Sequence, residues 1–133
     1  MKIAIPKETR ANETRVAAVP ETVKKLTKLG AEVVVEKGAG GPASYTDAAF
    51  EEAGASLAEG FAATVEGAEI VLKILAPTAE EVGQLAKGQK VFATMMPFRE
   101  PEIMQACAAG GIDAFAMEFM PRITRAQSMD VLS

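Results

Sequence analysis

Short runs of apolar residues alternate along the chain with longer amphipathic stretches, and glycine or proline stands at most of the boundaries between them. Runs that are apolar through most of their length are typical of strands buried on both faces of a parallel sheet. Five strands are predicted on this basis, over residues 2–5, 32–36, 70–74, 90–95 and 113–118.

The stretches between the strands have the spacing and the end signals of helices. Residues 20–29 begin with proline, carry apolar side chains at helical spacing and precede a glycine. Thr78 and Glu81 form the pattern of a capping box at the start of a helix that extends to Gly88. Further helices are predicted over residues 47–53, 57–65 and 101–110.

This alternation of strands and helices predicts an α/β fold, a doubly wound and mainly parallel sheet with helices on both faces. Ligands of such Rossmann-like domains bind beyond the carboxyl ends of the strands. We therefore expect functional side chains in the loops 6–19, 37–46, 74–78, 96–100 and 119–126.

The glycine-rich loop 38–43 matches G-x-G-x-x-A, the looser form of the fingerprint that binds dinucleotides. It follows the second predicted strand instead of the first, contains Pro42, and has no acidic residue at the end of a following strand. A turn between a strand and a helix is the favoured interpretation, so the fold is predicted without the dinucleotide fingerprint. The glycines would still allow the backbone to line a cleft.

Two cations are candidate cleft residues. Lys73 interrupts an apolar strand near its carboxyl end, where an ammonium group is costly unless it meets a carboxylate or an open crevice. A site role and a structural ion pair are both open for this lysine. Arg15 lies in the charged first loop and could reach the same crevice, although a solvated cluster is the usual outcome for such a loop.

Polar side chains gather after the fifth predicted strand. Arg122, Gln127 and Asp130 surround the start of a helix that is expected near Thr124. Residues three apart lie on the same side of a helix, so these groups can converge on one ligand. A solvated entry to the helix is the alternative interpretation.

Composition limits the chemistry further. The chain has 133 residues, 49% of them hydrophobic, which is the balance of one globular domain. A net charge of -4 disfavours nucleic-acid binding, and no apolar stretch approaches the roughly 20 residues of a membrane span. Because histidine is absent and Cys107 is the single cysteine, histidine triads, imidazole metal sites and zinc ribbons are excluded within this chain, and no metal site is predicted.

Four stretches together resemble the N-terminal part of the alpha subunit of proton-translocating NAD(P) transhydrogenases. They are residues 2–8, 12–17, 36–40 and 121–130. The first three are also similar to alanine dehydrogenases, so the fourth stretch discriminates between the two groups. Position 96 also favours the transhydrogenases. Met96 stands where the resemblance to alanine dehydrogenases implies a catalytic histidine, and a thioether cannot accept a proton.

The resemblance implies hydride transfer from NADH to NADP, coupled to proton translocation through a separate membrane component. It places Arg122, Gln127, Asp130 and Ser133 around the nicotinamide of NAD(H) as cofactor-binding residues. Gln127 would donate and accept hydrogen bonds, and Arg122 would position the ring or a neighbouring phosphate. Arg15 and Lys73 match the pyruvate-binding pair of the dehydrogenases.

The same resemblance implies partners and a location. NADP(H) would bind to a partner subunit or domain, the full subunit would form a homodimer, and the protein would be cytoplasmic and peripheral to the inner membrane. Residues 1–133 are expected to be an incomplete N-terminal domain, inactive alone, from which the following NAD-binding Rossmann domain is absent. An alanine dehydrogenase-like oxidoreductase domain and a non-catalytic binding or assembly module are the alternatives.

Overall fold

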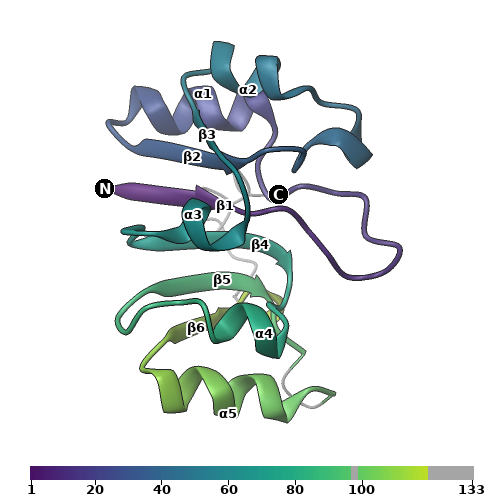
Figure 1. Ribbon diagram of the computed structural model, residues 1–133, viewed down its shortest axis with the longest axis vertical. Helices are drawn as coiled ribbons and strands as arrows, with labels where there is room; N and C mark the ends of the chain where they lie inside the picture. Colours follow the sequence, from purple (N-terminus) through teal and green to yellow (C-terminus); the bar gives the residue numbers. More distant parts are fainter. Residues whose placement is uncertain (97–98, 120–133) are drawn as a thin grey trace.

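The computed structural model describes residues 1–96 and 99–119. Within these residues, one parallel sheet has the strand order β3-β2-β1-β4-β5-β6 (Figure 1). Its strands are β1 (Lys2–Ile5), β2 (Glu32–Glu36), β3 (Ser56–Ala58), β4 (Ile70–Leu75), β5 (Lys90–Thr94) and β6 (Asp113–Ala116). This is the strand order of doubly wound dinucleotide-binding domains, which confirms the predicted fold class.

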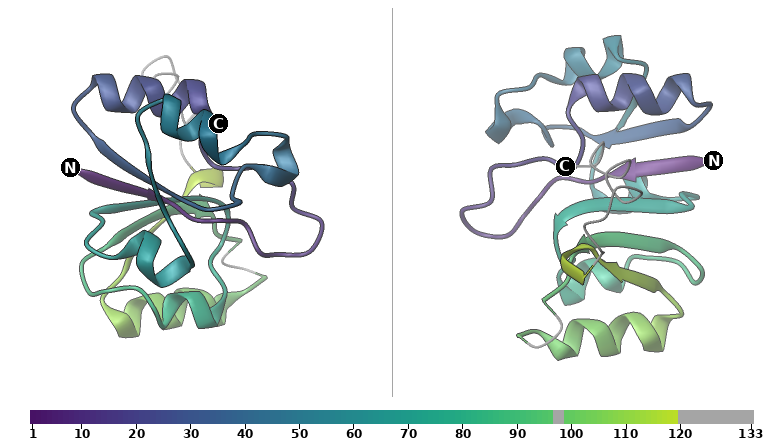
Figure 2. Two further views of the ribbon diagram at one scale, coloured as in Figure 1. Left: turned by 45° about the horizontal axis from the view of Figure 1, so that its top comes forward. Right: turned by 180° about the vertical axis from the view of Figure 1, so that it is seen from behind.

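Helices cover both faces of the sheet, as the left view of Figure 2 shows. On one face lie α1 (Pro20–Lys28) and α2 (Asp47–Glu52). On the other lie α3 (Phe61–Val65), α4 (Ala79–Val82) and α5 (Pro101–Gly110). Two short 3-10 helices, η1 (Gly41–Ala43) and η2 (Met117–Phe119), follow β2 and β6.

Alternation along each strand divides the apolar side chains between two cores. Ile3 and Ile5 of β1 pack into the core under α1 and α2, whereas Ala4 belongs to the core on the opposite face. Phe50 of α2 is completely buried in the first core. Both faces of β1 are therefore covered, which explains why its sequence is apolar through most of its length.

The predicted bounds of several elements are confirmed. β1, β2 and α5 begin and end at the predicted residues. The capping box is present, since the Thr78 hydroxyl accepts from the Glu81 N–H and the Glu81 carboxylate accepts from the Thr78 N–H. Local end signals were sufficient for these elements.

The helix predicted over residues 57–65 is wrong in its first part. Ser56–Ala58 forms the edge strand β3 instead, and the helix begins only at Phe61. The segment has little intrinsic strand propensity, and pairing with β2 through Val34 and Val35 decides its conformation.

The elements predicted over residues 20–29, 47–53 and 90–95 each end one residue earlier, and two others are shorter by more. The helix expected to extend to Gly88 ends at Val82 and is followed by Gly83. Hydrogen bonds of Gln89 hold the rest of that segment in place. Its side chain accepts from the Ala86 N–H and donates to the carbonyls of Val65 and Ala68. The strand expected to reach Glu118 ends at Ala116, where η2 begins.

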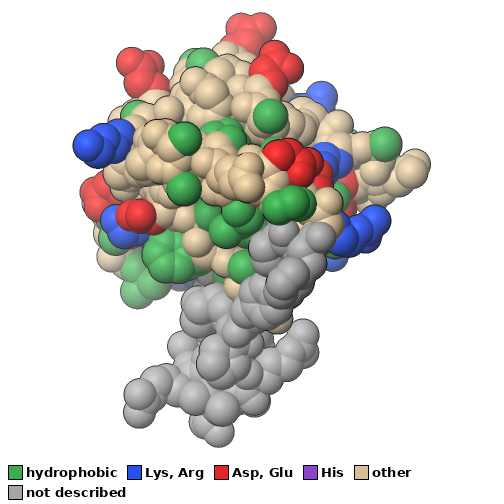
Figure 3. Space-filling model, turned by 90° about the horizontal axis from the view of Figure 1, so that it is seen from below, with side chains coloured by type: hydrophobic (Ala, Val, Ile, Leu, Met, Phe, Trp, Pro, Cys, Tyr) green, Lys and Arg blue, Asp and Glu red, His purple; other side chains and the backbone are tan. Residues whose placement is uncertain are grey.

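The edge of the sheet formed by β5 and β6 carries apolar side chains that no described helix covers. Phe92 and Phe115 of these neighbouring strands stack with their ring centroids 4.6 Å apart, and Phe115 is 40% exposed. They lie on the face whose helices, α1 and α2, pack mainly on β2 and β3. Figure 3 views the molecule from below, the side of α5 and β6 in Figure 1, and shows hydrophobic side chains interspersed with charged ones on this side.

None of the described helices combines the length and the apolar character that a membrane crossing requires.

Candidate functional site

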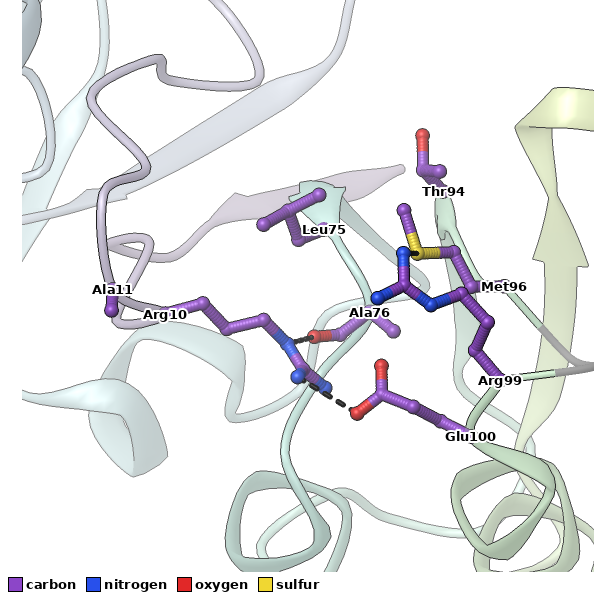
Figure 4. Close-up of a pocket in the computed structure, with 8 residues that line it drawn as sticks. All are labelled: Arg10, Ala11, Leu75, Ala76, Thr94, Met96, Arg99 and Glu100. Atoms are coloured by element: carbon purple, nitrogen blue, oxygen red, sulfur yellow. Dashed lines mark hydrogen bonds and ion pairs between the residues drawn. The ribbon is translucent and has the colours of Figure 1, made fainter.

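A cleft opens at the carboxyl ends of the central strands. The order of the strands reverses between β1 and β4, and ligands of doubly wound domains bind at this switch point. The cleft has a volume of about 390 Å³ (Figure 4). It is lined by Arg10, Ala11, Leu75, Ala76, Thr94, Met96, Arg99 and Glu100.

Arg10 joins three segments around the cleft. Its Nε donates to the Ala76 carbonyl at 2.8 Å, and its Nη2 donates to the Pro77 carbonyl at 3.2 Å. Its Nη1 forms an ion pair with Glu100 Oε1 at 2.9 Å. The guanidinium group thereby connects the loop after β1 with the loop after β4 and with the start of α5.

Met96 occupies a left-handed backbone conformation with φ 47°. Glu118 supports this turn, because its two carboxylate oxygens accept from the N–H groups of Met95 at 2.9 Å and Met96 at 2.6 Å. Burial raises the pKa of Glu118, but hydrogen bonds from the backbone of Met96, of Glu118 itself and of Met95 together outweigh it, so the pKa is lowered overall. The carboxylate therefore stays charged and holds the turn in place.

Lys73 is buried in an ionic cluster beneath the cleft. Its Nζ lies 3.3 Å from Glu8 Oε1 and 3.8 Å from Glu81 Oε1. Glu8 also accepts from the N–H groups of Ile74 at 2.8 Å and Leu75 at 3.2 Å. Of the two interpretations that the sequence left open for Lys73, the structure shows the ion pair, and Lys73 is not among the residues that line the cleft.

Arg15 pairs with its neighbour Glu13 on the surface. Its Nη2 lies 2.8 Å from Glu13 Oε1, and its side chain is 67% exposed, whereas that of Glu13 is 6% exposed. The hydrogen bond from Arg15 holds the pKa of Glu13 at about 2. The structure thus does not bring Arg15 together with Lys73, and Arg15 is also not part of the cleft lining.

The glycine-rich loop has a packing role. The Gly38 N–H donates to Asp47 Oδ1 at 2.9 Å, and Gly38 has φ +83°. A Cβ atom at Gly40 would lie 2.5 Å from the ring of the buried Phe50. A turn conformation accounts for Gly38 and close packing against Phe50 accounts for Gly40, in agreement with the favoured interpretation of the loop as a turn.

The remaining candidates, Arg122, Gln127, Asp130 and Ser133, lie outside the described residues. Conversely, sequence reasoning did not single out the cleft residues Arg10, Thr94, Arg99 and Glu100. Their one signal in the sequence was position, since all except Thr94 lie in loops that follow predicted strands.

Comparison with known proteins identifies the family to which this chain belongs. A family model described as "Alanine dehydrogenase/PNT, N-terminal domain" matches residues 4–133. The chain belongs to this family. Among its members, it is 48% identical over 138 aligned residues to an NAD(P) transhydrogenase subunit alpha polypeptide of Rhodospirillum rubrum, covering 100% of this chain and 36% of that protein.

Two further relatives agree. The chain is 43% identical to NAD(P) transhydrogenase subunit alpha of Haemophilus influenzae, covering 100% of this chain and 26% of that protein. The crystal structure of transhydrogenase from Sinorhizobium meliloti superposes with a TM-score of 0.90 at 46% identity, covering 99% of this chain and 39% of that chain. The resemblance predicted from the sequence is confirmed, and this family member spans about a quarter to two fifths of the length of these relatives.

Proposed function

We propose that the chain forms one wall of the NAD(H) cleft in a transhydrogenase alpha subunit, which transfers hydride from NADH to NADP and couples this transfer to proton translocation. The observation that carries the proposal is the side chain of Met96, which follows β5 at the carboxyl end of the sheet. Met96 lines the cleft where the resemblance to alanine dehydrogenases implies a proton-transferring histidine. A site without that group is suited to orienting a cofactor and unsuited to oxidising an amino acid.

In this proposal four residues contact the nicotinamide end of NAD(H). Arg122, Gln127, Asp130 and Ser133 follow η2 in the sequence, and Glu118 of η2 is bonded to the turn at Met96. The segment that precedes these residues therefore lies at the cleft end of the sheet. When bound, NAD(H) supplies the hydride chemistry. The side chains would position the ring by hydrogen bonding and charge, which accelerates a transfer by orientation.

Lys73 and Arg15, the two candidate cleft cations, have different roles in this proposal. Lys73 anchors the first loop through Glu8 beneath the cleft. Arg15 would reach a bound cofactor only by leaving Glu13, with which it forms an exposed pair. We therefore assign Lys73 to the frame of the site and keep Arg15 as a candidate contact.

The proposal includes the rest of the assembly. An NAD(H)-binding Rossmann domain would follow this domain, and NADP(H) would bind to a partner subunit or domain. A membrane-spanning component would carry the protons, and the alpha subunit would form a homodimer on the cytoplasmic surface of the inner membrane. Because the chain supplies one wall only, it is expected to be inactive alone.

Calorimetric titration of NADH tests the proposal. We expect no micromolar binding to the 133-residue chain and clear binding to a longer version that includes the next domain. In the longer protein, Gln127→Leu should weaken NADH binding about tenfold, as expected for a lost hydrogen bond to a positioned ligand. Gln84→Leu, at an exposed glutamine beyond α4, is the matched control and should leave the affinity unchanged.

Three results would contradict the proposal. Micromolar NADH binding to the short chain would show that one wall is sufficient. Alanine-dependent reduction of NAD by the longer protein would instead support the alanine dehydrogenase alternative. Absence of NADH binding by both versions, with a partner protein recovered by the short chain, would favour an assembly module.

A further inference from the structure

We propose that the cleft binds a small oxyanion, a phosphate or carboxylate group, between the guanidinium groups of Arg10 and Arg99. The proposal concerns side chains that the NAD(H) proposal does not use, and it does not depend on that proposal. It also differs from the pair Arg15 and Lys73, because neither of those cations lines the cleft, whereas Arg10 and Arg99 both do.

Arg10 provides a guanidinium group that is fixed before any ligand arrives. Its three protein contacts use Nε, Nη1 and Nη2 once each. A guanidinium group has five N–H donors, so two remain available for an anion. The side chain is 24% exposed, so these donors are reachable from the cleft. A planar group held in this way loses little conformational entropy when it binds an oxyanion.

Arg99 provides a second cation with weaker ties to the protein. The one side-chain hydrogen bond found for it goes to the Met96 sulfur at 3.9 Å, and a thioether is a weak acceptor. Across residues 1–96 and 99–119, no carboxylate lies within ion-pair distance of Arg99. Figure 4 shows both guanidinium groups directed into one space, with the Glu100 carboxylate beside Arg10.

The charge balance of the cleft favours an anion. Its charged lining residues are Arg10, Arg99 and Glu100, two cations and one anion, in a chain whose net charge is -4. A local excess of positive charge on an acidic protein concentrates anions at that point.

The size of the cleft agrees with a small ligand. Its volume of about 390 Å³ is at the lower end of the roughly 300–1,000 Å³ of small-molecule sites. Leu75, Ala76 and Met96 add apolar wall to the charged groups. The cleft therefore suits a compact molecule with one oxyanion group and a short apolar part.

The test is a titration of inorganic phosphate into the isotopically labelled 133-residue chain at constant ionic strength, followed by backbone amide shifts. We expect saturable shifts confined to the amides of Ala76, Met96, Arg99 and Glu100. Arg99→Gln should weaken binding about tenfold, since a hydrogen bond to a charged group is lost. Lys28→Gln, at an exposed lysine in the last turn of α1, is the control and should change nothing.

Acetate, titrated in the same way, distinguishes the two sources of the oxyanion. Tighter binding of phosphate would assign the cleft to phosphorylated ligands, and tighter binding of acetate would assign it to carboxylates. Arg10→Lys keeps the charge but loses the planar fork, so it should weaken either anion while the thermal unfolding transition is retained. Shifts that do not saturate, or that weaken equally in Lys28→Gln, would overturn the proposal.

Discussion

The loop that follows β1 contributes one carboxylate to each of two ion pairs, and these two pairs differ in their surroundings. Glu8 at its start meets Lys73, and the two side chains are 2% and 1% exposed. Glu13 farther along, with a side chain that is 6% exposed, meets Arg15, whose side chain is 67% exposed, so in this pair the cation faces water. In the sequence both were charges in or beside a candidate ligand loop.

The difference shows how burial decides what a charged pair does. A buried charge loses its hydration, so removing its partner leaves an uncompensated ion and strongly destabilises the fold. The backbone donors of Ile74 and Leu75 also depend on Glu8. An exposed pair gains little, because water and salt screen it and its side chains lose entropy. The first pair therefore belongs to the frame of the cleft, and the second contributes little to stability.

Removing the charge of Lys73 breaks the buried pair and should have the largest effect on stability. Lys73→Met keeps a long unbranched side chain but leaves Glu8 and Glu81 facing no cation. The free energy of unfolding should fall by about 3–5 kcal/mol. Urea denaturation followed by circular dichroism measures this loss. Lys28→Met, at an exposed lysine, is the control and should stay within about 0.5 kcal/mol of the parent chain.

A double variant makes this prediction sharper. Adding Glu8→Gln to Lys73→Met removes one of the two uncompensated charges, so part of the lost stability should return. A loss below about 1 kcal/mol in the single variant, or no recovery in the double variant, would mean that the buried cluster is energetically like a surface pair.

Loss of the capping box at α4 should have an intermediate effect on stability. Thr78→Ala removes the hydroxyl that accepts from the Glu81 N–H, and Glu81 also contacts Lys73. We expect a loss of about 1 kcal/mol in the free energy of unfolding. Thr46→Ala removes the exposed cap of α2 and is the matched control. A larger loss at Thr46 than at Thr78 would contradict a special role for the buried cluster.

Loss of the pair between Arg15 and Glu13 should change the stability very little at neutral pH. Arg15→Gln removes the ion pair with Glu13, and because the guanidinium side chain is 67% exposed, the pair is expected to contribute at most about 1 kcal/mol. Thermal unfolding of the variant and of the parent chain at neutral pH should therefore nearly coincide. A loss comparable with that of Lys73→Met would show that this part of the loop is also structural.

The smallest expected effect is a pH dependence of that same difference. Arg15 lowers the pKa of Glu13 from its ordinary value of 4.5 to about 2, so the pair adds stability only while Glu13 is ionised. This contribution is fully present above about pH 4.5 and is lost as the pH falls towards 2. Parent chain and Arg15→Gln, compared by urea denaturation between these pH values, should converge at the acid end. A gap that widens on acidification would contradict the assignment.

Local signals predicted much of the fold. The prolines that begin α1 and α5, the capping pair Thr78 and Glu81, and the apolar runs of β1 and β2 act over a few residues, and the structure agrees with each. The edge strand β3 was missed because its pairing with β2 lies outside its own sequence. The ends of α4 and β6 were misplaced for a similar reason, since Gln89 and Glu118 fold back onto other segments.

The candidate site was predictable as a place more than as a set of residues. The loops after the predicted strands were identified from the rule that ligands of doubly wound folds bind beyond the carboxyl ends of the strands. Arg10, Arg99 and Glu100 lie in two of these loops, but their meeting depends on contacts across as many as 90 positions of the chain. No local pattern could show that Arg10 would be held while Arg15, farther along the same loop, would face solvent.

The sequence by itself determined the fold class, the family and the chemistry that this chain lacks. Periodicity and end signals act locally, and a missing histidine is missing from every conformation. Only the tertiary structure decided the role of each charge. Whether a lysine is a ligand or a buried partner depends on hydration and on carboxylates brought from distant segments, as Glu8 and Glu81 are brought to Lys73. Those quantities exist only once the chain has folded.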